Sequence, residues 1–444
     1  MSLVTIQVGQ CGNQIGSQLF STIADDMLMK NPGISASSND NYIQQAQRTF
    51  FNTSIISGPT ENQESLKARA VMVDMEPKVI AQVQEEAKMS KVWSYSERQQ
   101  FCHKRGSGNN WAHGFCTHGP QAREIILNLV QSEVEKCDYF GGFLNIMSLA
   151  GGTGSGVGTY LTRTLRDEFP HSFILNQVVG PYNTGEVIVQ NYNAVLSLAH
   201  LYSSSDAILC LENDVLHKIC AQLLNIKNIS FRDMNKVISH AVASILQPAR
   251  SYENNYFIRN PLASIMEDLV SHPGYKLLSL RTIPMMSDHS VEFSTFQWYS
   301  LIKHLRQMLI ANAQMEEGID WQVQVNSMYN RCIGNLLVLR GKEIESANIS
   351  SFRDKRLYSS WVPDSCALTI WKQQRQLRKY EKSATLLSNC QASAKALDNM
   401  VGKAWSMFSS RAYIHHYLRH GISEDDFVDC FAGLEQVIKN YKEI

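Results

Sequence analysis

The sequence of 444 residues lacks several features, and each absence excludes a class of protein. Its 41 lysines and arginines balance 41 aspartates and glutamates, so the charge calls for neither a nucleic-acid partner nor a membrane surface. It has no amino-terminal signal region and no long uncharged apolar run, so we expect a cytoplasmic protein. Its ten cysteines include no C-x-x-C pair, which favours free thiols over a disulfide framework.

Length and composition predict a globular chain of more than one part. Hydrophobic residues make up 44% and charged residues 18%, which is typical of a globular protein, and 444 residues exceed one ordinary core. There is no internal repeat or low-complexity tract. We predict a nucleotide-binding domain over 1–225, a long helix with a mixed α/β second domain over 226–385, and a C-terminal helical region over 386–444.

One glycine-rich stretch, 148–158, organises the first of these parts. Four glycines within six residues follow an apolar run at 142–147, which predicts a buried strand, and precede a predicted helix at 159–166. Without Cβ atoms an anion can approach the backbone, and the helix adds its positive dipole end. The hydroxyls of Thr153 and Ser155 add donors. We therefore predict a nucleotide-phosphate turn, with a merely flexible glycine turn as the alternative.

The glycine stretch does not match two common nucleotide loops. No Lys-Ser/Thr pair follows it, which excludes the lysine-bearing P-loop. The G-x-G-x-x-G spacing also fails, because the third position is Val157 or Thr159. This argues against a dehydrogenase-type enzyme, for which no active-site constellation is present either.

Strands and helices alternate through the first 225 residues. Runs at 3–8, 70–74, 173–179 and 207–211 predict further strands, so the fold class is α/β with a doubly wound parallel sheet and nucleotide at its carboxyl edge. Asp74 and Glu76 follow one strand, before Pro77 opens a helix, where carboxylates serve Mg²⁺ directly or through water. Capping of that helix is the alternative.

Three motifs together resemble the tubulin family. They are Gly-Gly-Thr-Gly-Ser-Gly at 151–156, the amino-terminal stretch 8–16, and Ser-Gly-Asn-Asn-Trp-Ala at 107–112, with weaker similarity from residue 1 to about 440. The resemblance implies a GTP-binding cytoskeletal protein of the cytoplasm that acts at centrioles, the centrosome and basal bodies at the cilium base. It further implies support of triplet microtubules and cilium formation, with other tubulins and centriolar proteins as partners.

The resemblance also assigns roles to individual positions. The residues that it implies contact the phosphates are Gln10, Cys11, Ser148, Gly151, Gly152, Thr153, Gly154, Ser155 and Gly156, with Gly108 and Asn109 at the terminal phosphate. It implies that Asp74 and Glu76 bind Mg²⁺ and that Glu186 and Gln190 contact the ribose. The residues that it implies contact the base are Gln14, Asn213, Phe231 and Asn235. Carboxamides suit a purine edge because they supply donor and acceptor together. Without the resemblance, Gln10 and Gln14 are equally well solvated helix-start residues, and an aromatic such as Phe231 is more often part of a core.

The sequence departs from the family at several positions. Ala150 replaces a glycine, and Gln190 replaces an acid, which alters ribose binding without excluding it. Polymerising tubulins hydrolyse GTP with an acid from the next subunit, and the matched position here is Ser264, which is no base. We therefore expect that this chain does not activate the GTP of a neighbouring subunit, and that its own GTP is hydrolysed if a partner tubulin supplies the acid. An alternative function is a non-polymerising, nucleotide-dependent partner of another divergent tubulin.

The remaining segments predict individual loops, helices and strands. The polar stretch 31–66 predicts a long loop, and 113–136, 226–250, 393–410 and 423–442 predict helices. Strands are predicted at 275–280, 321–325 and 333–339. The cysteines and histidines between 102 and 118 match no regular zinc spacing, so we expect ordinary packing there. The sequence ends in 440–444 without an acidic tail, so we expect surface partners unlike those of alpha- and beta-tubulins.

Overall fold

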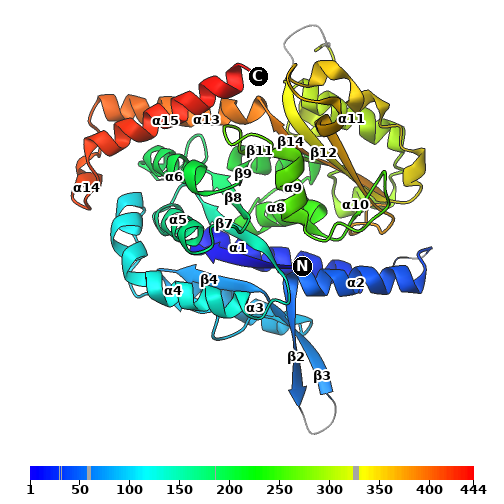
Figure 1. The fold of residues 1–444 in the computed structure, drawn as a ribbon, viewed down its shortest axis with the longest axis horizontal. Coiled ribbons are helices and arrows are strands. Elements are labelled where there is room, and N and C mark those ends of the chain that lie inside the picture. The colour runs from blue at the N-terminus through cyan, green and yellow to red at the C-terminus, as the bar shows by residue number, and fades with distance from the viewer. Residues whose placement is uncertain (30, 32, 58–61, 186, 324–329) are drawn as a thin grey trace.

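The computed structural model describes residues 1–444 apart from 30, 32, 58–61, 186 and 324–329. Within the described residues, no helix combines the length and apolarity needed to cross a membrane. The architecture is a large central sheet with helices on both faces (Figure 1). The predicted α/β fold class is therefore confirmed.

Six parallel strands form the amino-terminal half of the sheet, in the order β6-β4-β1-β7-β8-β9. They are β1 (Ser2–Val8), β4 (Ala70–Asp74), β6 (Gln100–Cys102), β7 (Phe140–Ser148), β8 (Ile174–Gly180) and β9 (Ala207–Glu212). Because the chain starts in the middle and winds outwards in both directions, this half is doubly wound, as predicted. β1, β4, β7 and β8 are buried on both faces along nearly their whole length, which explains their near-continuous apolar runs.

The other half of the sheet is mixed. It consists of β10 (Arg250–Ser251), β11 (Leu277–Ile283), β12 (Cys332–Gly341), β13 (Leu368–Gln373) and β14 (Lys382–Cys390), in the order β10-β13-β12-β14-β11. The halves join where β11 runs parallel to β9, through Leu277 opposite Ile208 and Leu278 opposite Leu209. β11 meets β14 through six registered pairs. The β9–β11 join is therefore the narrowest pairing between long strands.

Helices cover the two faces of the parallel half with separate buried cores. On one face lie α1 (Gly9–Leu28), α3 (Pro77–Met89), α8 (Phe231–Leu246) and α9 (Pro261–Leu269). On the other lie α4 (Gly119–Val134), α5 (Gly158–Glu168) and α6 (Gln190–Ser204), and α13 (Ala392–Ser409) and α15 (Glu424–Lys442) lie across α6 (Figure 1). A third core surrounds α11 (Trp298–Ile310) against β12 and β14.

Shorter helical pieces complete the described chain. They are π-helical turns at His113–His118, Thr153–Val157 and Ile219–Leu223, the helices α7 (Asn213–Lys218), α10 (Asp288–Glu292), α12 (Asp364–Ala367) and α14 (His415–Leu418), and 3₁₀ turns at Glu316–Gly318, Ile344–Ser346, Ser350–Arg353 and Lys355–Leu357. The predicted strands at 275–280 and 333–339 and the two C-terminal helices are confirmed as β11, β12, α13 and α15. The division at 225 and 385 stays a prediction.

The prediction of a long loop over 31–66 is wrong. The segment forms α2 (Ala36–Phe50) and the antiparallel pair β2 (Phe51–Ser57) and β3 (Asn62–Ala68), which projects from the body (Figure 1). Tyr42, Ala46 and Phe50 recur every four residues and are all buried, so a narrow apolar stripe suffices to hold a polar helix. The side chain of Ser35 caps the helix by accepting from the Ser38 backbone N–H.

Two predicted boundaries and one strand are also wrong. Helix begins at Thr153 rather than 159, because the glycines form its first π-helical turn, with Gly156 N–H donating to Gly152 O at 2.9 Å. The stretch 9–12 predicts a turn before a helix that ends at about residue 29, but α1 already begins at Gly9. Residues 321 and 322 form a bend and 323 is irregular, so none of the three is in a strand, and 324–325 lie outside the described residues.

Candidate nucleotide-binding site

The polar loops predicted to bind nucleotide follow strands that end level with one another. Val8 lies opposite Val73, Ser148 opposite Val179, and Gly180 opposite Glu212. Because these strands are parallel, their carboxyl ends share one edge of the sheet. This is the edge at which open α/β sheets bind ligands.

Three loops are in direct contact at this edge. The hydroxyls of Ser107 and Thr153 lie 3.4 Å apart. A Cβ atom added to Gly9 would lie 3.0 Å from Gly154 N, and one added to Gly152 would lie 2.6 Å from Asn110 N. The start of α1, the loop 107–112 and the glycine turn therefore approach closely enough that side chains would not fit between them. The structure thus brings the three motifs of the sequence together.

Backbone donors are available in two of these loops. Gly108 and Asn109 have positive φ angles of 59° and 53°, and neither backbone N–H has an acceptor among the described residues. The helix that starts at Thr153 leaves its first N–H groups without intrahelical acceptors. Free N–H groups beside the positive end of a helix bind phosphate. The side chains shape the turn: Ser155 Oγ donates to Gly151 O, and Ser148 Oγ accepts from Ala150 N at 3.2 Å.

Asp74 is a buried carboxylate without a cation. It ends β4, is 5% exposed, and accepts hydrogen bonds from the backbone N–H groups of Glu76, at 3.4 Å, and of Met75. Burial raises the pKa of Asp74 to about 6, and the negative charge of Glu76 adds to the rise, although backbone N–H groups oppose it. Among the described residues no basic side chain pairs with Asp74. Hard carboxylate oxygens at Asp74 and Glu76, beside a phosphate turn, are the donor set that suits Mg²⁺.

The groups predicted to read the base lie on two helix starts. Asn213 begins α7, and Phe231 begins α8 after a capping box made by Ser230 and Asp233. The Phe231 ring is 60% exposed, so it belongs to no core, which was the alternative to stacking. The side-chain amides of Asn213 and Asn235 have no hydrogen-bond partner among the described residues. They are free to bind a ligand.

The remaining predicted residues vary in exposure. Gln10 is exposed and Gln14 half-buried on α1, while burial raises the pKa of the Cys11 thiol to about 12, so this thiol stays neutral. Gln190 is buried and its Nε2 donates to Tyr182 O at 2.8 Å, which leaves the amide oxygen for a ribose hydroxyl. Glu186 lies outside the described residues.

Comparisons with known proteins agree with this geometry. Residues 2–221 match the Tubulin/FtsZ family, GTPase domain. Over 457 aligned residues, with 99% of both chains covered in each case, the sequence is 50% identical to the tubulin delta chains of Canis lupus familiaris and Homo sapiens and 49% identical to that of Mus musculus. The chain belongs to the tubulin family. Family membership makes it a cytoskeletal, microtubule-related protein of the cytoplasm, implies that it binds GTP, and suggests tubulin partners.

The tubulin-family chain has a residue at the phosphate loops that no sequence pattern indicated. Asn193, on α6, is fully buried. Its Oδ1 accepts from Trp111 N at 3.0 Å and from the Tyr417 hydroxyl at 2.6 Å. Its Nδ2 donates to Asn109 O at 2.9 Å and to Ala150 O at 2.8 Å. Its partners are 43 to 224 residues away in sequence, and three of its four bonds go to backbone groups, so spacing carries no signal of them.

The segment that holds Ser264 lies on α9, away from these loops in sequence. Glu267 is exposed, whereas burial raises the pKa of Asp268 to about 6 despite a side-chain hydrogen bond from Thr369.

Across the described residues, no three His, Cys, Asp or Glu side chains are arranged to hold a metal ion. Three histidines of the stretch 102–118 instead contact one another, with the rings of His113 and His118 4.4 Å apart and those of His103 and His118 5.6 Å apart.

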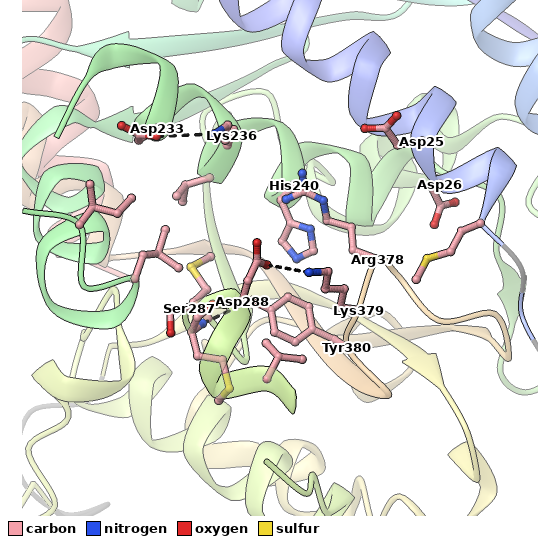
Figure 2. Close-up of a pocket in the computed structure, with 17 residues that line it drawn as sticks. Asp25, Asp26, Asp233, Lys236, His240, Ser287, Asp288, Arg378, Lys379 and Tyr380 are labelled. Atoms are coloured by element: carbon pink, nitrogen blue, oxygen red, sulfur yellow. Dashed lines mark hydrogen bonds and ion pairs between the residues drawn. The ribbon is translucent and has the colours of Figure 1, made fainter. Parts of the chain in front are cut away.

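Two large cavities lie at different distances from the phosphate loops. One of about 560 Å³ is lined by 107–110, 187–189 and the C-terminal residues Tyr413, His416, Arg419 and His420. The other, of about 510 Å³, lies between α1, α8 and the second half of the chain (Figure 2). In that cavity Asp233 pairs with Lys236 at 3.6 Å and Lys379 with Asp288 at 3.7 Å. None of the described residues predicted to contact nucleotide lines it.

Proposed function

We propose that this tubulin-family chain binds GTP with Mg²⁺ at the carboxyl edge of its parallel strands and acts at centrioles and basal bodies. There it supports triplet microtubules and cilium formation, with other tubulins and centriolar proteins as partners. The observation that carries the nucleotide part is the direct contact of the start of α1, the loop 107–112 and the glycine turn. The cellular role rests on the full-length similarity to tubulin delta chains.

Each group of residues has one task in this proposal. Backbone N–H groups of Gly108, Asn109 and the glycine turn hold the phosphates, and Asp74 with Glu76 holds Mg²⁺, which neutralises phosphate charge when bound. The exposed Phe231 ring stacks on guanine, and the unpaired amides of Asn213 and Asn235 bind its edge. Gln190, with Glu186, contacts the ribose.

A second function is favoured by one position. Ser264 stands on α9 where the resemblance places the acid that activates a neighbour's GTP, and a serine hydroxyl is a poor general base. The chain would then be a nucleotide-dependent partner of another divergent tubulin that does not polymerise by itself. Its own GTP is hydrolysed only when that partner supplies the acid.

The first test is to denature the purified chain and identify the released nucleotide by chromatography. We expect one guanine nucleotide per chain, retained when ATP is in excess and lost when Mg²⁺ is chelated. An empty chain that folds stably would contradict GTP binding, and displacement by ATP would contradict the roles of Asn213 and Asn235. Sedimentation with candidate tubulins, with and without GTP, separates a polymerising subunit from a non-polymerising partner.

The cellular role needs a separate test. Cells lacking the chain should form centrioles without triplet microtubules and assemble fewer cilia, and the wild-type chain should restore both. Normal triplets in its absence would contradict the centriolar role and leave GTP binding intact.

A further inference from the structure

The buried side-chain amide of Asn193 makes two donor and two acceptor hydrogen bonds beside the phosphate loops. Its two donor and two acceptor contacts, at 2.6 to 3.0 Å, go to Asn109, Ala150, Trp111 and Tyr417. Asn109 and Trp111 lie in the loop 107–112, Ala150 lies in the glycine turn, and Tyr417 lies in α14. One buried amide therefore connects both phosphate loops to the C-terminal segment. We name Asn193 and Tyr417 the phosphate-side clamp.

The C-terminal segment is held against the loops by further contacts. Asn110 Nδ2 donates to His416 O at 2.9 Å, while Asn110 Oδ1 accepts from His113 N at 3.1 Å. Tyr192, beside Asn193 on α6, donates to Ala412 O at 3.0 Å. Tyr417 is fully buried. The segment 412–420 is thus fixed by hydrogen bonds to the elements that carry the phosphate loops.

The opposite side of this segment faces solvent. Tyr413 and Leu418 are 40% and 39% exposed, and Arg419 and His420 line the cavity of about 560 Å³ with the loop 107–110. A shift of the loop would leave buried polar groups of the clamp unpaired unless α14 shifted with it. The two elements must therefore move together or lose hydrogen bonds.

We propose that Asn193 is a positioning residue that transmits the occupancy of the phosphate loops through Tyr417 to the exposed surface of α14. The inference rests on the proposed GTP site and adds a relay from that site to a surface more than 200 residues further along the chain. A terminal phosphate bound by the N–H groups of Gly108 and Asn109 fixes the loop. The clamp then fixes α14, so the nucleotide state sets which C-terminal surface a partner meets.

The chain contains a matched control for this idea. Asn389, on β14, is also fully buried; its Nδ2 donates to Leu269 O and Tyr275 O at 2.8 Å, and its Oδ1 accepts from the Tyr441 hydroxyl at 2.8 Å. We name Asn389 and Tyr441 the sheet-side clamp. It has the same chemistry but contacts none of the described residues predicted to bind nucleotide. Tyr417→Phe and Tyr441→Phe each remove one hydroxyl from an asparagine oxygen and keep the ring.

The experiment compares these two variants in the full-length chain. We expect both to lower the melting temperature, and Tyr441→Phe to lower it more, because the Tyr441 hydroxyl also accepts from Leu277 N at 2.8 Å. Only Tyr417→Phe should speed the release of a fluorescent GTP analogue, by about tenfold, whereas Tyr441→Phe should stay within about twofold of wild type. Hydrogen exchange of 413–420 should slow on adding GTP to wild type and Tyr441→Phe, and should not respond in Tyr417→Phe, although 107–112 still responds.

A second variant protects the test against misfolding. Asn110→Asp keeps the oxygen that accepts from His113 N and loses the donor to His416 O, and it should weaken the response of 413–420. Equal GTP release from the two tyrosine variants, or exchange at 413–420 that ignores GTP in wild type, would overturn the relay. Failure of wild type to bind GTP would overturn the proposed function, and the relay with it. That outcome is distinct because the release assay then shows no bound nucleotide at all.

Discussion

The phosphate-side clamp and the sheet-side clamp are built from the same two residue types. In each, a fully buried asparagine donates to two backbone carbonyls and accepts from a tyrosine hydroxyl of the C-terminal helices. The first joins the loop 107–112 and the glycine turn to α14, whereas the second joins the end of α9 and the segment before β11 to α15. Chemistry alone therefore does not define a functional residue. What distinguishes the pair is that one clamp holds loops whose N–H groups are free.

Removal of either asparagine should have the largest effect. Asn193→Leu and Asn389→Leu each remove the donor from two buried or partly buried carbonyls and the acceptor from a buried tyrosine hydroxyl, so the free energy of unfolding should fall by at least about 3 kcal/mol in both. Saturating GTP should restore stability to Asn389→Leu but not to Asn193→Leu, because only a variant that binds ligand is stabilised by it. Urea unfolding with and without GTP measures this. Equal rescue by GTP would remove the distinction between the clamps.

Gly154→Val should disrupt phosphate binding at the glycine turn while leaving both clamps in place. A Cβ atom there would lie 3.0 Å from Ser148 O and 3.1 Å from Ser148 N, which are backbone atoms that cannot move aside cheaply. We expect GTP affinity to fall about 100-fold, or about 2.8 kcal/mol, in a calorimetric titration. The matched control is Gly402→Val on α13, where nothing lies within 4 Å of the added Cβ atom. Unchanged affinity in Gly154→Val would rule out the glycine turn as the phosphate site.

Two carboxyl groups, one at the phosphate edge and one at the end of α9, should each make the stability of the chain depend on pH. Burial raises the pKa of both Asp74, at the phosphate edge, and Asp268, at the end of α9, to about 6. The folded chain thus holds these protons more tightly than the unfolded chain, whose aspartates titrate near pH ~3.9. Stability without nucleotide should therefore fall as pH rises from about 4 to about 6, and stay lower above that.

Asparagine substitutions separate the two groups. After allowance for solvent screening, Asp74→Asn and Asp268→Asn should each raise the stability of the nucleotide-free chain at pH 7 by about 1–2 kcal/mol and flatten part of the decline. Mg²⁺ with GTP should abolish only the part of the pH-dependent loss of stability that is due to Asp74. Urea unfolding from pH 4 to pH 8 provides the measurement, and an Asp74 contribution that persists with Mg²⁺ and GTP would argue against the metal role.

Phe231→Ala should have the smallest effect. Its ring is 60% exposed, so stability should change by less than about 0.5 kcal/mol, while loss of base stacking weakens GTP binding by about 1 kcal/mol, or about fivefold. Tyr299, 69% exposed on α11, offers the matched control, because Tyr299→Ala should change neither quantity. Equal GTP affinity in the two variants would show that Phe231 is an ordinary surface aromatic and does not stack on the base.

Five strands of the parallel half were predictable from the sequence because their signals are local and strong, whereas β6, β10, β13 and β14 were not predicted. β1, β4, β7, β8 and β9 are apolar runs that end in polar turns, and each was predicted within two residues of its bounds. The glycine turn was placed correctly in the chain, but its helical first turn was missed, since glycine is a poor helix former in isolation. Tertiary packing overrode that preference.

Other elements were missed because their stabilisation is not local. The buried stripe of α2 has only three apolar residues in a polar sequence, so composition favoured a loop. Asn193 gave no signal for a different reason. A buried amide is defined by the groups that surround it, and for Asn193 these come from three separate segments: the loop 107–112, the glycine turn and α14. Of the site, the sequence therefore predicted which residues could contact a ligand, but not the one that holds their loops together.

The narrow join between β9 and β11 has a mechanical consequence. The strand pairs on either side of this join, β8 with β9 and β11 with β14, each share six registered residue pairs, whereas β9 and β11 share two. A subunit compressed or stretched inside a polymer carries force through its backbone pairs, and the weakest row yields first. We expect the chain to shear along this line, with each half of the sheet remaining intact as a rigid plate on either side.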